Sequence, residues 1–176
     1  TPRQEAKESI ELLRSLGIRV IMLTGDNEAV AREVSQKLGI QEFRAGITPE
    51  GKLEEIAKLS ADGVLAMVGD GVNDAPALAR ANVGIAMGAG GTAVAVEAAN
   101  VVILTDQLER IPDMIKLARR TVSVVNGDMI IWFVTNAVGV GLVFTGILGP
   151  ALAAFYNFAT DFLPLLNSLR LFRDKK

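Results

Sequence analysis

The sequence lacks both cysteine and histidine among its 176 residues. Without cysteine there is no disulfide and no thiolate metal site, and without histidine the commonest general base and imidazole ligand are missing. The net charge is only −2, and no basic run carries interleaved aromatic residues, so we expect no nucleic-acid partner. Any chemistry must therefore use carboxylates, hydroxyls, lysine and amides.

The amino terminus also lacks two features, an initiator methionine and the apolar core of a secretion signal. Thr1 followed by Pro2 is typical of a helix start instead, and an apolar stripe at helical spacing continues to Gly17. We therefore expect the sequence to be a piece of a longer protein.

Charge is nearly absent from the last third of the chain, where residues 129–169 contain Asp161 as their one charged side chain. The runs 129–148 and 151–171 are each long enough to cross roughly 30 Å of hydrocarbon, and Gly149-Pro150 marks a turn between them. They predict a two-helix transmembrane hairpin. Basic residues flank both outer ends, which the positive-inside rule places in the cytosol. The flanking residues are Arg119, Arg120, Arg170, Arg173, Lys175 and Lys176.

The first part of the chain alternates short apolar runs with helical patterns. The pattern predicts strands at 19–23, 64–68, 83–86 and 101–104, and helices at 28–38, 48–59 and 74–81. Such alternation favours an α/β fold with a parallel sheet between helices, and ligands then bind at the carboxyl ends of the strands. We expect this Rossmann-like domain at 1–126, and the hairpin with a cytosolic tail at 127–176, in the plasma (inner) membrane.

Two carboxylates follow the predicted strand 64–68, in the loop Gly69-Asp70-Gly71-Val72-Asn73-Asp74. Asp70 and Asp74 can both face one hard cation, so the loop predicts a Mg²⁺ site, with Asn73 as an uncharged donor. Asp-Gly and Asn-Asp are also ordinary turn formers, and the loop taken alone supports both interpretations.

Two further positions fit an anion. Thr24-Gly25-Asp26 ends the first predicted strand, where a hydroxyl and the amides of a helix start can hold a phosphoryl group, although helix capping explains Thr24 or Asp26 singly. Lys52 lies in the first turn of a predicted helix, where the helix dipole disfavours a cation. A nearby anion explains it better, although exposed helical lysines are common.

Taken together, these three motifs resemble, in order and spacing, the phosphorylation domain of P-type ATPases within the haloacid dehalogenase superfamily. The motifs are Thr24-Gly25-Asp26, Pro49-Glu50-Gly51-Lys52 and Gly69-Asp70-Gly71-Val72-Asn73-Asp74-Ala75-Pro76. The resemblance implies half of a haloacid dehalogenase domain followed by the last two transmembrane helices of the pump. It further implies ATP as the substrate and Mg²⁺ as the cofactor.

The resemblance also implies individual roles. Thr24 and Gly25 would hold the transferred phosphoryl group with support from Asp26, and Lys52 would neutralise its charge. Asp70 would bind Mg²⁺, Asp74 would complete or support that site, and Asn73 would contact phosphoryl oxygens. The family's nucleophile lies in an Asp-Lys-Thr-Gly motif, which is missing here. The nucleotide-binding and actuator domains are missing too, so we expect the isolated segment to be inactive and its partner to be the amino-terminal part of the pump.

The hairpin contains the candidate residues for a transported metal cation. Asp161 is a costly ionisable group within a span, and Asn136 and Asn157 could join it, although interhelical hydrogen bonding also explains the asparagines. The ending Asn167-Ser168-Leu169-Arg170-Leu171 resembles the heavy-metal branch of the family. Asn157 stands where copper transporters tend to have methionine and zinc transporters aspartate. Without a soft sulfur ligand, a borderline or hard divalent cation is favoured over Cu(I).

Two alternative functions remain open. A membrane-anchored phosphatase of the same superfamily would use the same residues without moving an ion. A non-catalytic fragment would act as an interaction module. Polar groups inside the predicted hairpin argue against a passive anchor.

Overall fold

The structure is a computed structural model that describes residues 4–69, 72–88 and 93–172. The chain divides into two compact units, Thr1–Asp113 and Met114–Lys176. Thr1 and Pro2, which the sequence predicts to start the first helix, lie outside the described residues.

The first unit alternates helices and strands, as the sequence predicts. Its elements are α1 (Gln4–Ser15), β1 (Ile21–Leu23), α2 (Glu28–Leu38), β2 (Glu42–Arg44), α3 (Pro49–Ala61), β3 (Ala66–Gly69), the 3-10 helix η1 (Val72–Asp74), α4 (Ala75–Arg80), β4 (Val83–Met87), α5 (Ala93–Ala98) and β5 (Val101–Ile103). All strand pairs are parallel, which confirms the α/β class.

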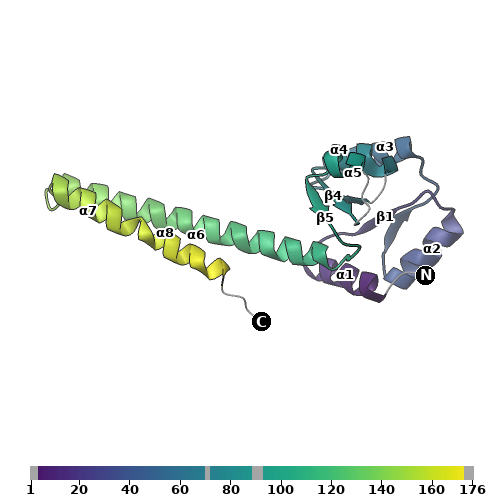
Figure 1. The fold of residues 1–176 in the computed structure, drawn as a ribbon, viewed down its shortest axis with the longest axis horizontal. Helices are drawn as coiled ribbons and strands as arrows, with labels where there is room; N and C mark the ends of the chain where they lie inside the picture. Colours follow the sequence, from purple (N-terminus) through teal and green to yellow (C-terminus); the bar gives the residue numbers. More distant parts are fainter. Residues whose placement is uncertain (1–3, 70–71, 89–92, 173–176) are drawn as a thin grey trace. The chain divides into compact units, whose positions relative to one another are not determined.

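The strands form two sheets. β1 pairs with β2, and β4 lies between β3 and β5. Figure 1 shows α3, α4 and α5 gathered on one side of the strands and α1 and α2 on the other. Because all strands of a sheet run the same way, their carboxyl ends share one edge, where the polar loops lie.

The core of the first unit forms where α4 packs on β4. Leu78 of α4 is fully buried, and Ile56 of α3 and Ala86 of β4 are each 1% exposed. Gly84 allows α4 and β4 to approach closely, since a Cβ atom there would lie 2.5 Å from the Leu78 carbonyl oxygen. No side chain fits at that distance, so this contact requires glycine.

Three strands differ from the prediction by two residues or more. β1 begins at Ile21 rather than at residue 19. β3 begins at Ala66 rather than at residue 64, because Val64 is 89% exposed and pairing with β4 starts where Ala66 faces Val83. β2 was missed altogether. It contains a single apolar residue, Phe43, and is held by pairing with β1, a contact distant in sequence that local periodicity does not reveal.

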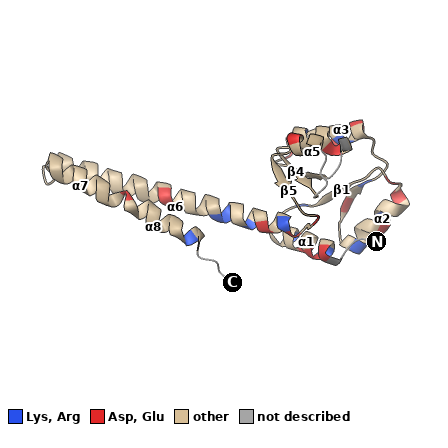
Figure 2. Cartoon of the chain, viewed as in Figure 1, with Lys and Arg blue, Asp and Glu red and all other residues tan. Residues whose placement is uncertain are grey.

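The second unit is a helical hairpin. α6 (Arg110–Phe144) begins at the end of the first unit, and α7 (Pro150–Thr160), α8 (Phe162–Ser168) and the 3-10 helix η2 (Leu169–Leu171) follow. In Figure 2 the ribbon is almost entirely tan along α7, α8 and the later part of α6, which marks few Lys, Arg, Asp or Glu residues there. Among the described residues, α6 is the one helix long and apolar enough to cross a membrane, and its most apolar stretch is almost wholly exposed, unlike a core helix.

The second predicted span, 151–171, is interrupted rather than continuous. α7 ends at Thr160 and α8 begins at Phe162. Pro164 explains the interruption, because proline has no N–H for the carbonyl four residues earlier and its ring crowds that carbonyl. The helical prediction missed this consequence of Pro164.

Two contacts tie the helices of the second unit together. The Tyr156 hydroxyl donates a hydrogen bond to the Thr135 carbonyl at 2.9 Å, and a Cβ atom at Gly139 would lie 2.7 Å from the Tyr156 ring. Near the other end, Asp128 of α6 accepts hydrogen bonds from Asn167 at 2.8 Å and from Ser168 at 2.6 Å. We call this second group of three residues the Asp128 clasp.

Candidate functional site

The loop after β1 is fixed by its own hydrogen bonds. The Thr24 hydroxyl donates to the Asp26 carboxylate at 3.0 Å and accepts from the Asp26 amide at 3.1 Å. The Thr24 carbonyl accepts from the Ile47 amide at 3.1 Å, and the Asp26 carbonyl accepts from the Gly46 amide at 2.7 Å. Residues 24–26 are therefore anchored to the segment that leads into α3.

Lys52 extends from the first turn of α3. Thr48 caps this helix by accepting a hydrogen bond from the Gly51 amide at 3.1 Å, and Pro49 stands at the helix start. Because the 46–47 segment is bonded to the Thr24 loop and Thr48 fixes the start of α3, the position of Lys52 is set relative to that loop.

Lys52 and Asp74 form a well-shielded ion pair. Lys52 Nζ lies 2.8 Å from Asp74 Oδ1, and their side chains are only 19% and 15% exposed. Partial burial strengthens such a pair and makes either charge costly without the other. The structure thus brings together two predicted site residues that are 22 positions apart in the sequence.

Asp74 folds back over the end of β3. A Cβ atom at Gly69 would lie 2.8 Å from Asp74 Cβ and 2.9 Å from Asp74 Oδ2, so glycine leaves the room that this carboxylate occupies. Asn73, its neighbour in η1, is exposed to solvent. Asp70, the predicted Mg²⁺ ligand, lies outside the described residues.

A cleft of about 760 Å³ adjoins Asp74 at the carboxyl ends of β3 and β4. Gly69 and Met87 line it from the strands, and the acidic side chains Glu5, Asp106 and Glu109 line it as well. Its place agrees with the expectation that ligands bind at this edge of a parallel sheet.

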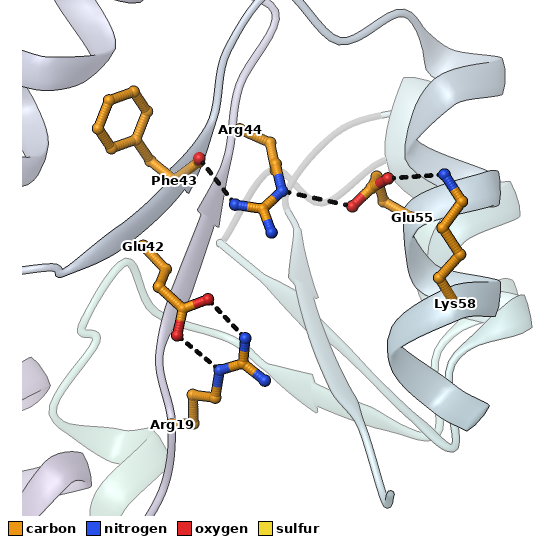
Figure 3. Close-up of polar contacts among 6 residues, drawn as sticks. All are labelled: Arg19, Glu42, Phe43, Arg44, Glu55 and Lys58. Atoms are coloured by element: carbon orange, nitrogen blue, oxygen red, sulfur yellow. Dashed lines mark hydrogen bonds and ion pairs between the residues drawn. The ribbon is translucent and has the colours of Figure 1, made fainter. Parts of the chain in front are cut away.

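An ion-pair network supports the site from outside (Figure 3). Arg44 at the end of β2 lies 3.5 Å from the Glu55 carboxylate of α3, and Lys58 is 3.0 Å from the same residue. Arg19 binds Glu42 through two hydrogen bonds, one of 2.7 Å. The Arg44–Glu55 pair joins β2 to α3, the helix that carries Lys52, and the Arg19–Glu42 pair joins β2 to the segment before β1. Sequence reasoning missed them, because exposed charges without periodicity give no local signal.

The same network shifts the acidity of its carboxylates. Hydrogen bonding from Arg19 lowers the pKa of Glu42 below its ordinary value, and hydrogen bonding from Lys58 lowers the pKa of Glu55. The same contact raises the pKa of Lys58. Arg19 and Lys58 are exposed and the two carboxylates are partly exposed, so water screens the interactions and each contributes little to stability.

The hairpin brings together two of its three predicted ion-binding residues. Asn136 and Asn157 line one cavity of about 220 Å³, with Gly139 and Tyr156 between them. The Asn136 amide donates to the Trp132 carbonyl at 2.8 Å, which leaves its side-chain oxygen for another partner. Asp161 does not line this cavity and stands instead at the break between α7 and α8.

The oxygen chemistry of the first site suits Mg²⁺, which prefers carboxylate and water ligands. Asp74 Oδ1 is engaged by Lys52, so its other oxygen remains for a metal or a water. Among residues 4–69, 72–88 and 93–172, no group of three or more carboxylates gathers closely enough to hold a metal ion. Asp74 therefore fits a supporting role beside further ligands.

Comparison with known proteins places this geometry in context. The sequence profile "haloacid dehalogenase-like hydrolase" matches residues 1–82. The chain is 45% identical over 173 residues to a zinc-exporting P-type ATPase of Mycobacterium marinum, and equally identical to a manganese-exporting P-type ATPase of Mycobacterium tuberculosis. Each alignment covers 97% of this chain and 24% of the relative, so the chain spans about a quarter of their length.

Solved structures agree with the sequence comparison. A zinc-transporting PIB-type ATPase in its E2.Pi state matches with a TM-score of 0.92 and 38% identity. The match covers 98% of this chain and 28% of that chain. Both described units thus follow the fold of one segment of such a protein.

Proposed function

We propose that the chain is the carboxy-terminal part of an ATP-driven metal-cation pump of the heavy-metal P-type ATPase family, working through an aspartyl-phosphate intermediate. The match of residues 1–82 to the haloacid dehalogenase-like family and the likeness of the whole chain to metal-transporting P-type ATPases support this proposal. The first unit would stabilise the phosphoryl group as it passes to and from the aspartate, and the second unit would contribute to the ion path.

The observation that carries this proposal is the Lys52–Asp74 pair beside the anchored Thr24 loop. Asp74, at the carboxyl ends of the strands, holds Lys52 Nζ at 2.8 Å. The Lys52 ammonium group would therefore lie close to a phosphoryl group bound at this edge of the sheet. Phosphoryl transfer spreads negative charge over three equatorial oxygens, and fixed cations and N–H donors stabilise that charge.

Each predicted residue then takes a defined role. The Thr24 hydroxyl and the Gly25 amide would donate to phosphoryl oxygens. Because a hydroxyl has one proton, Thr24 would give up its 3.0 Å hydrogen bond to Asp26 on doing so, while the Asp26 carbonyl keeps the loop anchored to the Gly46 amide. Lys52 neutralises phosphoryl charge, and the exposed Asn73 contacts an oxygen. Asp74 orients Lys52 by its ion pair, which makes it a supporting residue.

Asp70 and Asp74 would hold Mg²⁺ in this proposal. When bound, Mg²⁺ would offset the charge on the phosphoryl oxygens. The nucleophilic aspartate of an Asp-Lys-Thr-Gly motif must come from another part of the pump, since the motif does not occur in this sequence. The segment alone would therefore not turn over ATP, and its first partner is the remainder of the same protein.

The transported ion would meet oxygen and amide ligands. Asn136 and Asn157 share a cavity, and Asp161 adds a carboxylate at the helix break. Such ligands suit a hard or borderline divalent cation better than Cu(I). The zinc-exporting and the manganese-exporting relative are each 45% identical to the chain. Overall sequence identity therefore does not favour either of these two metals.

The proposed setting is a bilayer, with both outer ends of the hairpin and residues 1–126 in the cytosol. The length and apolar composition of α6 support a spanning helix. The basic residues near both outer ends support the cytosolic orientation. A plasma (inner) membrane is the setting we propose.

The test is ATP hydrolysis by the complete protein in lipid, measured against a panel of Mn²⁺, Zn²⁺, Cd²⁺, Co²⁺ and Cu⁺. We expect selective stimulation by one or two divalent ions. We also expect an acid-stable phosphoenzyme in the presence of ATP and the stimulating ion. Hydrolysis that ignores every metal would contradict the pump and favour a membrane-anchored phosphatase.

A further inference from the structure

Asp161 occupies the one interruption of the second helix of the hairpin. α7 ends at Thr160, α8 begins at Phe162, and Asp161 links them. It is also the one charged side chain among residues 129–169. The charge and the break in the helix therefore coincide at one position.

The break frees a backbone oxygen next to this charge. In a continuous helix the Thr160 carbonyl would accept a hydrogen bond from residue 164, but Pro164 has no N–H to donate. The Thr160 hydroxyl cannot compensate, because it donates back to the carbonyls of Tyr156 and Asn157, at 3.0 and 3.1 Å. The last carbonyls of a helix also carry the negative end of its dipole, which favours a cation.

The break lies near the middle of the proposed span. Asp161 follows Pro150 by 11 residues, which at about 1.5 Å per residue is roughly 17 Å along the helix. The hydrocarbon core is about 30 Å thick, so Asp161 falls near its midplane. At that depth both a carbonyl without a hydrogen-bond donor and an unpaired carboxylate are unfavourable in hydrocarbon.

No described residue of the hairpin offsets this cost. Among the described residues, none forms a hydrogen bond or an ion pair with the Asp161 carboxylate, and the side chain is exposed. By contrast, Asp128 near the end of the hairpin has both oxygens bonded within its clasp. Asp161 is thus the carboxylate of the hairpin that is left for an external partner.

We propose that the Asp161 carboxylate and the Thr160 carbonyl, freed by Pro164, together form a binding site for a hard or borderline divalent cation. Broken helices in transporters bind cations with such freed carbonyls near the midplane. Two oxygens are fewer than a cation such as Mn²⁺ needs, so water or other parts of the pump complete the shell. The inference rests on the proposed pump function and adds Pro164 as the residue that creates one ligand.

The experiment uses the complete pump in lipid and measures ATP hydrolysis against free Mn²⁺, Zn²⁺ or Cd²⁺ concentration. Pro164→Ala restores an N–H that can occupy the Thr160 carbonyl, and Asp161→Asn removes the charge at nearly constant volume. We expect each to raise the half-saturating metal concentration about tenfold or more, which corresponds to about 1.4 kcal/mol. Phosphorylation by inorganic phosphate should remain, which reports that the variants are folded.

Pro150→Ala is the matched control. Pro150 is at the start of α7, where a backbone N–H has no intrahelical carbonyl to bond. Its replacement by alanine therefore adds no hydrogen bond to a helix carbonyl. An unchanged half-saturating concentration in Pro164→Ala would overturn the proposed carbonyl ligand. A wild-type pump indifferent to all three metals would instead refute the proposed function, and the two failures are thereby distinguished.

Discussion

The two units of the chain treat charge in opposite ways. In the first, Lys52 and Asp74 neutralise each other at 2.8 Å while both are mostly shielded from water. In the second, Asp161 stands at a helix break without a partner among the described residues. The ion pair keeps the Lys52 ammonium group in position both with and without a bound anion. The unpaired carboxylate in an apolar helix instead needs a cation or water as its partner.

The two units are more alike in their close packing than in their treatment of charge. Each unit has a contact that requires glycine, at Gly84 against a backbone carbonyl and at Gly139 against the Tyr156 ring. Backbone cannot yield as an aromatic ring can, so the first contact is the stricter one. The four predictions below test this contrast from the largest expected effect to the smallest.

Lys52→Ala should have the largest effect. Removing one fixed group that stabilises transition-state charge costs about 10²- to 10³-fold in rate. We expect ATP hydrolysis by the complete pump to fall at least about a hundredfold, measured at saturating ATP and metal. Lys58→Ala on the same helix is the control, because Lys58 is exposed and pairs with Glu55 away from the cleft. Equal losses in both variants would mean that Lys52 acts through the stability of α3 alone.

Gly84→Ala should destabilise the first unit. The added methyl group would lie 2.5 Å from the Leu78 carbonyl oxygen, so α4 and β4 must separate. Overpacking of this kind costs about 1–3 kcal/mol. Thermal unfolding of the purified chain in detergent, followed by circular dichroism, measures the loss. Gly63→Ala, which meets nothing within 4 Å, should change the transition little, and a similar shift in both would exclude the packing explanation.

Gly139→Ala should loosen the second unit by a smaller amount. Its methyl group would lie 2.7 Å from the Tyr156 ring, which can turn aside at a cost of about 1 kcal/mol. We expect a lower thermal aggregation temperature of the complete pump in detergent and weaker metal stimulation. Gly141→Ala, with open space around it, is the matched control. If Gly141→Ala has the same effect as Gly139→Ala, the Tyr156 contact is not the cause.

The smallest effect concerns the exposed Arg19–Glu42 pair. Hydrogen bonding from Arg19 lowers the pKa of Glu42 in the folded state. The pair therefore stabilises the fold fully when the pH is above the pKa of Glu42 in the unfolded chain. This stabilisation is lost as the pH falls through the lower pKa of Glu42 in the folded state. Glu42→Gln should therefore lower the unfolding midpoint slightly at pH 7 and lose this effect once the pH falls below the lowered pKa of Glu42 in the folded state. A constant difference at all pH values would indicate a cause other than charge.

The sequence predicted the parts of the fold that local patterns encode. Helices with a strong cap, such as α3 with Thr48 and Pro49, begin where the sequence places them. β2 was not predicted, because its stability comes from pairing with β1 rather than from its own apolar residues. The start of β3 was placed two residues early, since apolar character alone did not reveal that Val64 is exposed.

The candidate site was predictable in composition but not in contacts. The motifs named Thr24, Lys52 and Asp74, yet the ion pair between the latter two depends on how α3 and η1 meet across 22 residues of sequence. The supporting pair between Arg44 and Glu55 depends likewise on tertiary packing. In the hairpin, Pro164 could have predicted the break at Asp161, because its missing N–H is a local property.

The Asp128 clasp has a consequence for how the chain enters a membrane. A segment with a central aspartate and a proline inserts poorly by itself, since an aspartate at mid-helix costs about 2.5–3.5 kcal/mol. The short connection 145–149 joins α6 and α7 at one end, and the clasp of Asn167 and Ser168 on Asp128 joins α8 to α6 at the other. We therefore expect α6 and the α7–α8 segment to leave the translocon for the lipid together. Packing against the more apolar α6 would favour insertion of the α7–α8 segment.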